Sequence, residues 1–303
     1  MGGIGQWIGF LVFVLALLAL DLGLFHRRAH AVTFREAAIW SAIWVLLSLA
    51  LCLGIHLRYG PEPALQFLTV YLLEKSLSVD NIFLFALIFA DMGVAAEYQH
   101  RVLFWGVLGA IVMRGAFIGT GVELIRHFHF VLYVFAALLI VLGLRLFRRQ
   151  DKRHRPGGSR IVTLARKLFS ISESPEGGEF FTRCGGHLCA TSLLLVLIMI
   201  EMADVTFAID SIPAAFAVTQ DAFIIFTSNV MAVLGLRALY FLLARAISRF
   251  RYLHLAVAAI MILIGLRMLT AHWVRIPTVF ALAGIVLILG VAVIASLWSE
   301  CKQ

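Results

Sequence analysis

Residues 194–219 read LLVLIMIEMADVTFAIDSIPAAFAVT, an apolar run that contains three acids and one proline. The run exceeds the ~20 residues that a helix needs to cross a hydrocarbon core of ~30 Å. Lipid offers no partners for exposed peptide groups, so a segment that crosses it must form its hydrogen bonds internally, as a helix does. The stretch therefore predicts a membrane-spanning helix with acidic side chains at its centre.

The rest of the chain has the same character. Of its 303 residues, 62% are hydrophobic and only 14% are charged, which excludes an ordinary soluble domain. We predict an all-α polytopic membrane protein with about nine transmembrane helices, because nine segments have the required length and hydropathy. These segments are 6–25, 37–56, 64–90, 101–122, 128–147, 188–218, 222–244, 253–271 and 277–298.

The distribution of basic residues predicts how the chain is oriented. Lysines and arginines gather in alternate loops, namely those after spans one, three and seven, the segment 148–187 and the C-terminal tail. This is the pattern of the positive-inside rule, and it accounts for the formal net charge of +8 without nucleic acid as a partner. We expect the N-terminus outside the membrane and the C-terminus in the cytoplasm.

The chain also contains an internal repeat. The segment EKSLSVDNIF at 74–83 corresponds to DVTFAIDSIP at 204–213, and each has an acid followed six residues later by an aspartate. Two more matches follow in the same order in both halves of the chain. They pair VLGAIVMRG at 107–115 with MAVLGLRAL at 231–239, and LLIVLGLRLF at 138–147 with IMILIGLRML at 260–269.

Each copy of the repeat holds three helices, an odd number, so the second copy must enter the membrane from the opposite face. We therefore predict two inverted three-helix repeats, formed by spans 3–5 and 6–8, as in many secondary transporters. The chain is expected to form one membrane domain over 1–303. Within it, 64–147 is repeat one, 148–187 is a cytoplasmic linker loop and 188–271 is repeat two.

Acidic side chains in the middle of a membrane are expensive, at roughly 2.5–3.5 kcal/mol each on insertion scales. Three bases at similar depth, Lys75, Arg114 and Arg237, are expected to neutralise some of them in salt bridges. Two acids remain, and a dehydrated divalent cation would complete the charge balance. The five acids in the predicted spans are Glu74, Asp80, Glu201, Asp204 and Asp210.

The ligands on offer in the two motif helices are oxygens. Carboxylates are joined by the amide of Asn81, and Ser78, Ser211 and Asn229 are further candidates for support. Such a set suits Mg²⁺, Ca²⁺ or Mn²⁺ better than Cu(I) or Zn²⁺. Hydrogen bonds between helices are the simpler role for the serines and for Asn229.

Helical geometry adds an expectation about the backbone. Residues six apart lie about 120° from each other around a regular helix, so the paired acids of one motif cannot both face one small site. Pro213 removes a backbone donor close to Asp210, and serines crowd the matching part of the first motif. We expect both helices to unwind locally at these places.

Three segments carry a resemblance to a known family. At YLLEKSLSVDNIFLF (71–85), the stretch 194–219 quoted above and FTSNVMAVLGLRALYFLLA (226–244), the chain resembles the TerC family of membrane proteins. The resemblance implies inverted helical repeats, the bacterial inner (plasma) membrane and a role in lowering cytoplasmic manganese. It also implies metal-handling residues, which are here Glu74, Asp80, Asn81, Glu201, Asp204 and Asp210.

These observations favour a multi-pass secondary transporter that exports Mn²⁺, with protons as a candidate counter-ion and the lipid bilayer around it. We expect no cofactor and no enzymatic activity, since neither GxGD nor HExxH occurs. Because the family is named for tellurite resistance, an oxyanion handler using Arg114 and Arg237 is an alternative. A non-transporting scaffold acting through 148–187 is another, and the oligomeric state stays open.

Overall fold

The computed structural model describes most of the chain. Side chains within these ranges are also described, except those of residues such as Asp80 and Asp210 whose backbone alone is placed. The segment that the sequence indicates as a linker is described only at its C-terminal end. The ranges described are 2–25, 33–128, 130–148, 171–172, 179–184, 187–243, 253–270 and 277–300.

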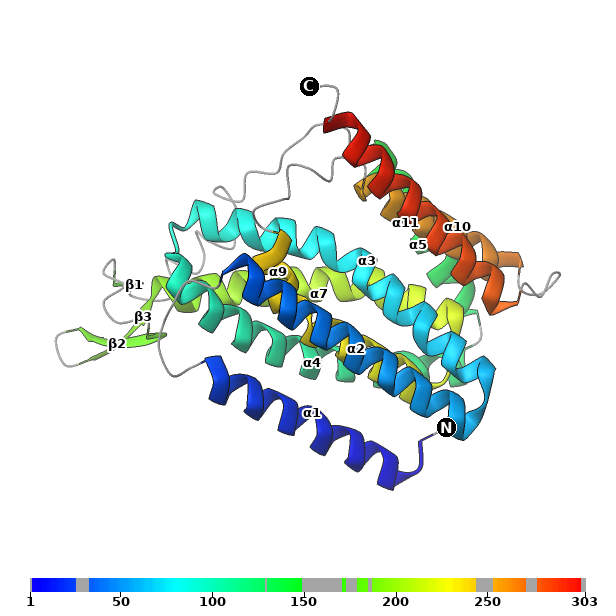
Figure 1. Ribbon diagram of the computed structural model, residues 1–303, viewed down its shortest axis with the longest axis horizontal. Helices are drawn as coiled ribbons and strands as arrows, with labels where there is room; N and C mark the ends of the chain where they lie inside the picture. Colours follow the sequence, from blue (N-terminus) through cyan, green and yellow to red (C-terminus); the bar gives the residue numbers. More distant parts are fainter. Residues whose placement is uncertain are drawn as a thin grey trace.

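Apolar helices dominate these ranges, as the sequence predicts, and lie side by side in one bundle (Figure 1). Each predicted span coincides with one helix, except that two short helices cover 222–244. The helices are α1 (Ile4–Phe25), α2 (Phe34–Tyr59), α3 (Pro61–Asp91), α4 (Ala96–His127), α5 (Val131–Arg148), α7 (Ser192–Val218), α8 (Ala222–Leu234), α9 (Leu236–Leu243), α10 (Leu253–Thr270) and α11 (Thr278–Glu300).

Length and hydropathy identify membrane spans among these helices. Five described segments suffice by themselves to cross a bilayer, namely α2, α4, α7, the α8–α9 pair and α11. Shorter apolar stretches occur in α1, α5 and α10. The prediction of an all-α integral membrane protein is therefore confirmed.

Local sequence sets several helix ends. Thr33 caps α2 by accepting a hydrogen bond from the backbone N–H of Glu36 at 3.3 Å, and Asp221 caps α8 in the same way through Phe223 at 2.9 Å. Gly60 alone separates α2 from α3 and has φ of 90° with ψ of −177°, a conformation open essentially only to glycine. Because the joint is a single residue, α2 and α3 form a tight helical hairpin.

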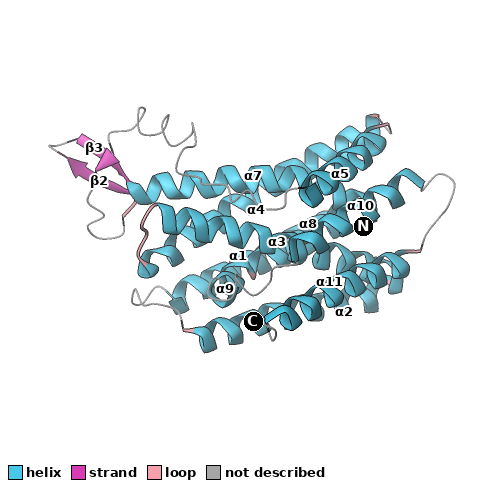
Figure 2. Cartoon of the chain, turned by 90° about the horizontal axis from the view of Figure 1, so that it is seen from above, coloured by secondary structure: helices cyan, strands magenta, loops and turns pink. Residues whose placement is uncertain are grey.

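The centre of the bundle is α8. Every side chain from Ile224 to Leu234 is buried, where α3, α4 and α2 pack around the helix (Figure 2). The helix α7 contacts α3, α4 and α5. Both helices that carry the acidic motifs therefore pack against several neighbouring helices.

Two peripheral helices, α5 and α10, interlock through matching glycines. A Cβ added to Gly143 would lie 2.9 Å from the carbonyl oxygen of Ala258, and one added to Gly265 would lie 2.9 Å from the carbonyl oxygen of Ala136. Small residues of this kind let membrane helices approach closely. The contact is reciprocal, since each helix offers a glycine to the backbone of the other at matching positions.

A small sheet lies at one end of the bundle (Figure 2), where a polar linker was predicted up to 187 and a membrane span from 188. It consists of β1 (Ile171–Ser172), β2 (Phe181–Cys184) and β3 (His187–Thr191), in the order β1-β3-β2. β3 pairs antiparallel with β2 and leads into α7. Strands of two to five residues are too short to give a clear alternation in the sequence, so the linker composition concealed them.

Adding a methyl group at either glycine of the α5–α10 contact should loosen the bundle. Gly143→Ala and Gly265→Ala should each lower the free energy of unfolding by about 1–3 kcal/mol, because the new Cβ meets a backbone carbonyl that cannot move aside. Thermal unfolding of the purified protein in detergent measures the effect. Gly290→Ala in α11 is the matched control, since open space surrounds Gly290; equal stability of all three variants would contradict the interlock.

Candidate functional site

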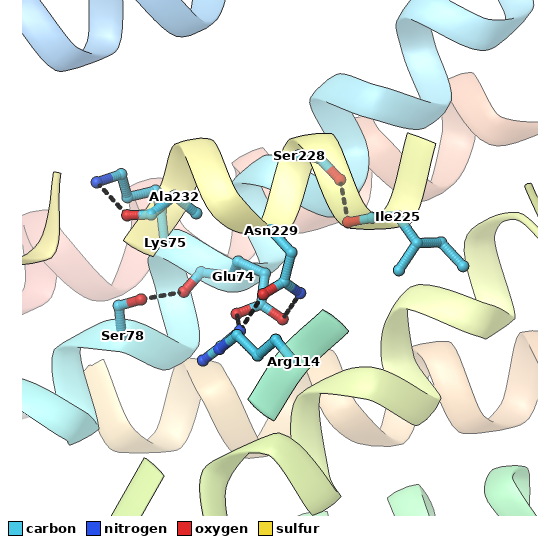
Figure 3. A network of polar contacts seen from close by, with 8 residues as sticks. All are labelled: Glu74, Lys75, Ser78, Arg114, Ile225, Ser228, Asn229 and Ala232. Carbon is cyan, nitrogen blue, oxygen red and sulfur yellow. Dashed lines mark hydrogen bonds and ion pairs between the residues drawn. The ribbon is translucent and has the colours of Figure 1, made fainter. Parts of the chain in front are cut away.

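A buried polar network joins three helices at the centre of the bundle (Figure 3). Glu74 of α3 accepts two hydrogen bonds. Arg114 Nη1 of α4 donates to its Oε2 at 2.6 Å, and Asn229 Nδ2 of α8 donates to its Oε1 at 2.6 Å. Arg114 Nη1 also donates to Asn229 Oδ1. All three residues are buried, with at most 2% of each exposed. Each carboxylate oxygen of Glu74 therefore has a donor of its own.

The acids of α7 lie beside this network. Asp204 is buried and interacts electrostatically with Arg114 and Glu74, so the guanidinium lies within reach of an acid from each motif. Glu201, one turn earlier, is half-buried and interacts with Asp204. The structure thus gathers Glu74, Glu201 and Asp204 into one acidic region with Arg114 as a shared base.

A glycine of α4 makes room for Glu201. A Cβ added to Gly109 would overlap the carboxylate of Glu201, so the acid lies directly against the backbone of α4. This residue is not among those that the sequence marks as candidates for the site. A glycine inside an apolar helix often has a packing reason, which is the only signal that the sequence contains.

The second acid of each motif is only partly placed. The backbone at Asp80 and Asp210 is helical, but their side chains lie outside the described residues. The residues that follow them, Asn81 and Ser211, are both buried. Asn81 Oδ1 and Ser211 Oγ have no hydrogen-bond partner among the described residues. Two buried oxygens thus occupy matching places in the two motifs without a donor among the described side chains.

The expected local unwinding of the motif helices is wrong. In the structure α3 is helical throughout Ser76–Asn81, and α7 continues through Pro213. The hydroxyls of Ser76 and Ser78 donate to the carbonyls of Leu72 and Glu74, each at 2.6 Å and one turn back, so they stay within the helix. Pro213 removes a single donor, which this long helix tolerates.

The break occurs instead in the predicted seventh span. α8 ends at Leu234 and α9 begins at Leu236, with Gly235 between them. The N–H of Gly235 bonds the carbonyl of Val233, and the carbonyl of Ala232 accepts a hydrogen bond from Lys75 Nζ at 3.0 Å. Lys75 thus contacts a backbone carbonyl rather than one of the described acids.

The third base has a different environment. Arg237 lies in the first turn of α9 and is buried. It lines a small cavity together with Trp40 and Trp44 of α2 and His100 of α4. The three bases of similar predicted depth therefore occupy three distinct places, and Arg114 is the one hydrogen-bonded to Glu74.

What this region can bind depends on which of its acids have donors or basic partners. Within the described side chains, no three carboxylate, imidazole or thiol groups are arranged to hold a metal ion. The same part of the structure gives Glu201 and Asp204 no hydrogen bond and no ion pair closer than 4 Å. Glu201 and Asp204 are therefore acids of the bundle that no described donor bonds.

A bundle of apolar helices long enough to cross a bilayer, with charged side chains in its interior, defines a multi-pass integral membrane protein. The chain belongs to the TerC family of integral membrane proteins, whose family model matches residues 59–303. The resemblance noted in the sequence is thereby confirmed.

Relatives extend over nearly the whole chain. The "Uncharacterized membrane protein STKORF319" of Myxococcus xanthus is 47% identical over 297 residues, which is 98% of this chain and 93% of the relative. The "Putative membrane-bound redox modulator Alx" of Escherichia coli K12 is 44% identical over 306 residues, covering 98% and 95%. A membrane protein of Rickettsia bellii is 38% identical over 291 residues, covering 96% of both chains. No solved structure matches the chain.

The ion pair at the centre of the network should behave as a coupled unit. Glu74→Gln and Arg114→Met should each cost about 3–5 kcal/mol of stability, because each leaves a buried charge without its partner. The double variant should cost clearly less than the sum, since neither Glu74 nor Arg114 is then left without the other. Unfolding in mixed micelles measures all three. Glu123→Gln, which removes an exposed ion pair with Arg126, should change stability by less than about 1 kcal/mol; additive single effects would contradict the coupling.

Proposed function

We propose that the chain is a secondary transporter that exports divalent manganese from the cytoplasm and binds the metal with carboxylates at the middle of the membrane. The observation that carries the proposal is the state of Asp204. It is buried in a lipid-spanning helix next to Glu201, with no hydrogen bond from any described residue. Two neighbouring acids without a donor of their own favour a divalent cation, which would compensate both.

The remaining oxygens fit the same chemistry. Asn81 Oδ1 and Ser211 Oγ are buried acceptors without a described donor, and they follow Asp80 and Asp210 directly. A hard cation would supply a partner to such oxygens without any histidine or cysteine. Manganese is the hard cation that the family resemblance indicates, and protons are the proposed counter-ion because carboxylates can exchange a metal for protons.

The proposed architecture is nine spans in one domain, with inverted repeats 64–147 and 188–271. The reciprocal contact of Gly143 and Gly265 supports it, because these glycines occupy the same place in the matched segments of the two repeats. A pseudo-two-fold axis between α5 and α10 produces this symmetry of contacts. We further propose the bacterial inner membrane, the N-terminus outside, and the linker 148–187 in the cytoplasm with the C-terminus.

The structure bears on the oxyanion alternative through Arg114. Glu74 and Asn229 both bond to Nη1 of this guanidinium, and Asp204 interacts with it electrostatically. An oxyanion at Arg114 would therefore be repelled by acids from both motifs. The arrangement therefore favours a cation substrate, and Arg237 is left as the arginine on which an oxyanion function would depend.

Replacing motif acids should abolish manganese export. In cells loaded with Mn²⁺, Asp80→Asn, Asp204→Asn and Asp210→Asn should each slow the loss of manganese at least tenfold, because the neutral amide lowers the charge that holds the cation. Metal content over time, at matched abundance in the membrane, measures the effect, and Glu123→Gln is the exposed control. Equal loss from all strains would move the function to an oxyanion handler or a scaffold, and tellurite tolerance of Arg237→Gln would then separate these two.

The place of Glu201 against α4 can be tested separately. Gly109→Ala should slow export several-fold, because the added methyl group must push the carboxylate of Glu201 away from α4. Transport by the purified protein in liposomes, with a fluorescent Mn²⁺ reporter inside, provides the measurement. Gly119→Ala on the same helix adds the same methyl group in open space and should transport like the wild type. A Gly109→Ala protein with unchanged kinetics would remove Glu201 from the site.

A further inference from the structure

The interruption between α8 and α9 presents a carbonyl group to a positive charge. The carbonyl oxygen of Ala232 lies in the last turn of α8 and accepts the hydrogen bond of Lys75 Nζ at 3.0 Å (Figure 3). Gly235 keeps helical dihedrals (φ −80°, ψ −3°) but its N–H bonds the carbonyl of Val233, so the helix is disturbed over this one residue. In secondary transporters, carbonyls at the ends of interrupted helices commonly coordinate the coupling cation.

The absence of a side chain at Gly235 leaves room for the ammonium group of Lys75. A Cβ added to Gly235 would lie 2.7 Å from Lys75 Nζ and 3.2 Å from Trp44 Cβ, so Gly235 provides the room in which the ammonium lies between α3, α8 and α2. The ring of Tyr71 lies 5.8 Å from Nζ, within the range of a cation–π contact. The carbonyl of Ala232, Gly235 and the ring of Tyr71 thus lie around one positive charge, the ammonium group of Lys75.

Acidic groups contribute nothing to this site among the described residues. The neighbouring Glu74 is fully used by Arg114 and Asn229. The partners of Lys75 are one carbonyl oxygen and one aromatic ring, which is a ligand set suited to a monovalent cation and too weakly charged for a divalent one. The site is therefore chemically distinct from the acidic region on α7.

We propose that the break at Gly235 is a monovalent-cation site which Lys75 fills with its own ammonium group. The protein then carries a tethered cation where comparable transporters take up an ion from solution, and it needs neither Na⁺ nor K⁺ to move its substrate. This inference rests on the proposed transport function only for that last consequence. The matching position of the second repeat is Val205, so the tethered charge belongs to one repeat alone.

Cutting back the side chain should open the site to small cations from solution. Lys75→Ala removes the ammonium and leaves the space, so the full-length purified variant should melt about 5 °C below the wild type in N-methylglucamine chloride. Methylammonium chloride should restore at least half of this loss with saturable concentration dependence, and Na⁺ or K⁺ should restore part of it. Lys75→Met is the matched control, because its apolar side chain fills the space and should give no response to any cation.

Each outcome decides for or against the site. A wild-type protein that melts higher in NaCl or KCl than in N-methylglucamine chloride at equal ionic strength would overturn the proposal, and this result does not depend on any variant folding. Identical behaviour of Lys75→Ala and Lys75→Met across all salts would also overturn it. In liposomes, wild-type Mn²⁺ transport should be unchanged when Na⁺ and K⁺ are replaced, whereas Lys75→Ala should transport several-fold faster with methylammonium.

The melting experiment contains no manganese, so the two proposals can fail separately. Rescue of Lys75→Ala by methylammonium together with a wild type that transports no Mn²⁺ would leave the cation site standing and remove the export function. Mn²⁺ transport by a wild type that requires Na⁺ would leave the export function standing and remove the proposed cation site.

Discussion

A charged side chain in the hydrocarbon layer must find a partner within the protein, and the pair of Glu74 and Arg114 is where this chain meets that demand most completely. The pair is hydrogen-bonded to Asn229 as well, so one network connects α3, α4 and α8. Replacing such a pair with apolar groups is often neutral for stability, which means that its presence is better explained by the arrangement it fixes. Here it fixes the position of the first motif next to the acids of α7.

The bundle is held together in two physically different ways. Its central helices meet through buried polar groups, and the partner of each group must come from a particular neighbouring helix. Its peripheral pair, α5 and α10, meets through glycine and backbone, where close approach alone provides the attraction. Polar pairing suits a region that has to present charges, whereas close packing without charge suits a region that only has to stay in contact.

Much of the fold and the family follow from the sequence because hydropathy in a bilayer is a strong constraint. Sequence reasoning also finds the acids, since each is exceptional in an apolar run. It does not find which base serves which acid: Glu74 is 40 residues from Arg114 and 155 from Asn229, and their pairing is decided by packing. Local unwinding was predicted in the two motif helices, because Pro213 is a strong sequence signal for it. The break lies instead in the predicted seventh span, at Gly235, which is a weaker signal. The short sheet was missed because its strands leave no periodic pattern.

The reciprocal contact of α5 and α10 limits how the two halves of the protein can move. Sliding one helix along the other would drive the side chains of Ile140 and Ile262 off the glycines that admit them, because the two contacts run in opposite senses. Rotation about the line between Gly143 and Gly265 leaves both contacts in place. Turning about this line is therefore the motion that the two glycine contacts permit, whereas sliding is the motion that they oppose.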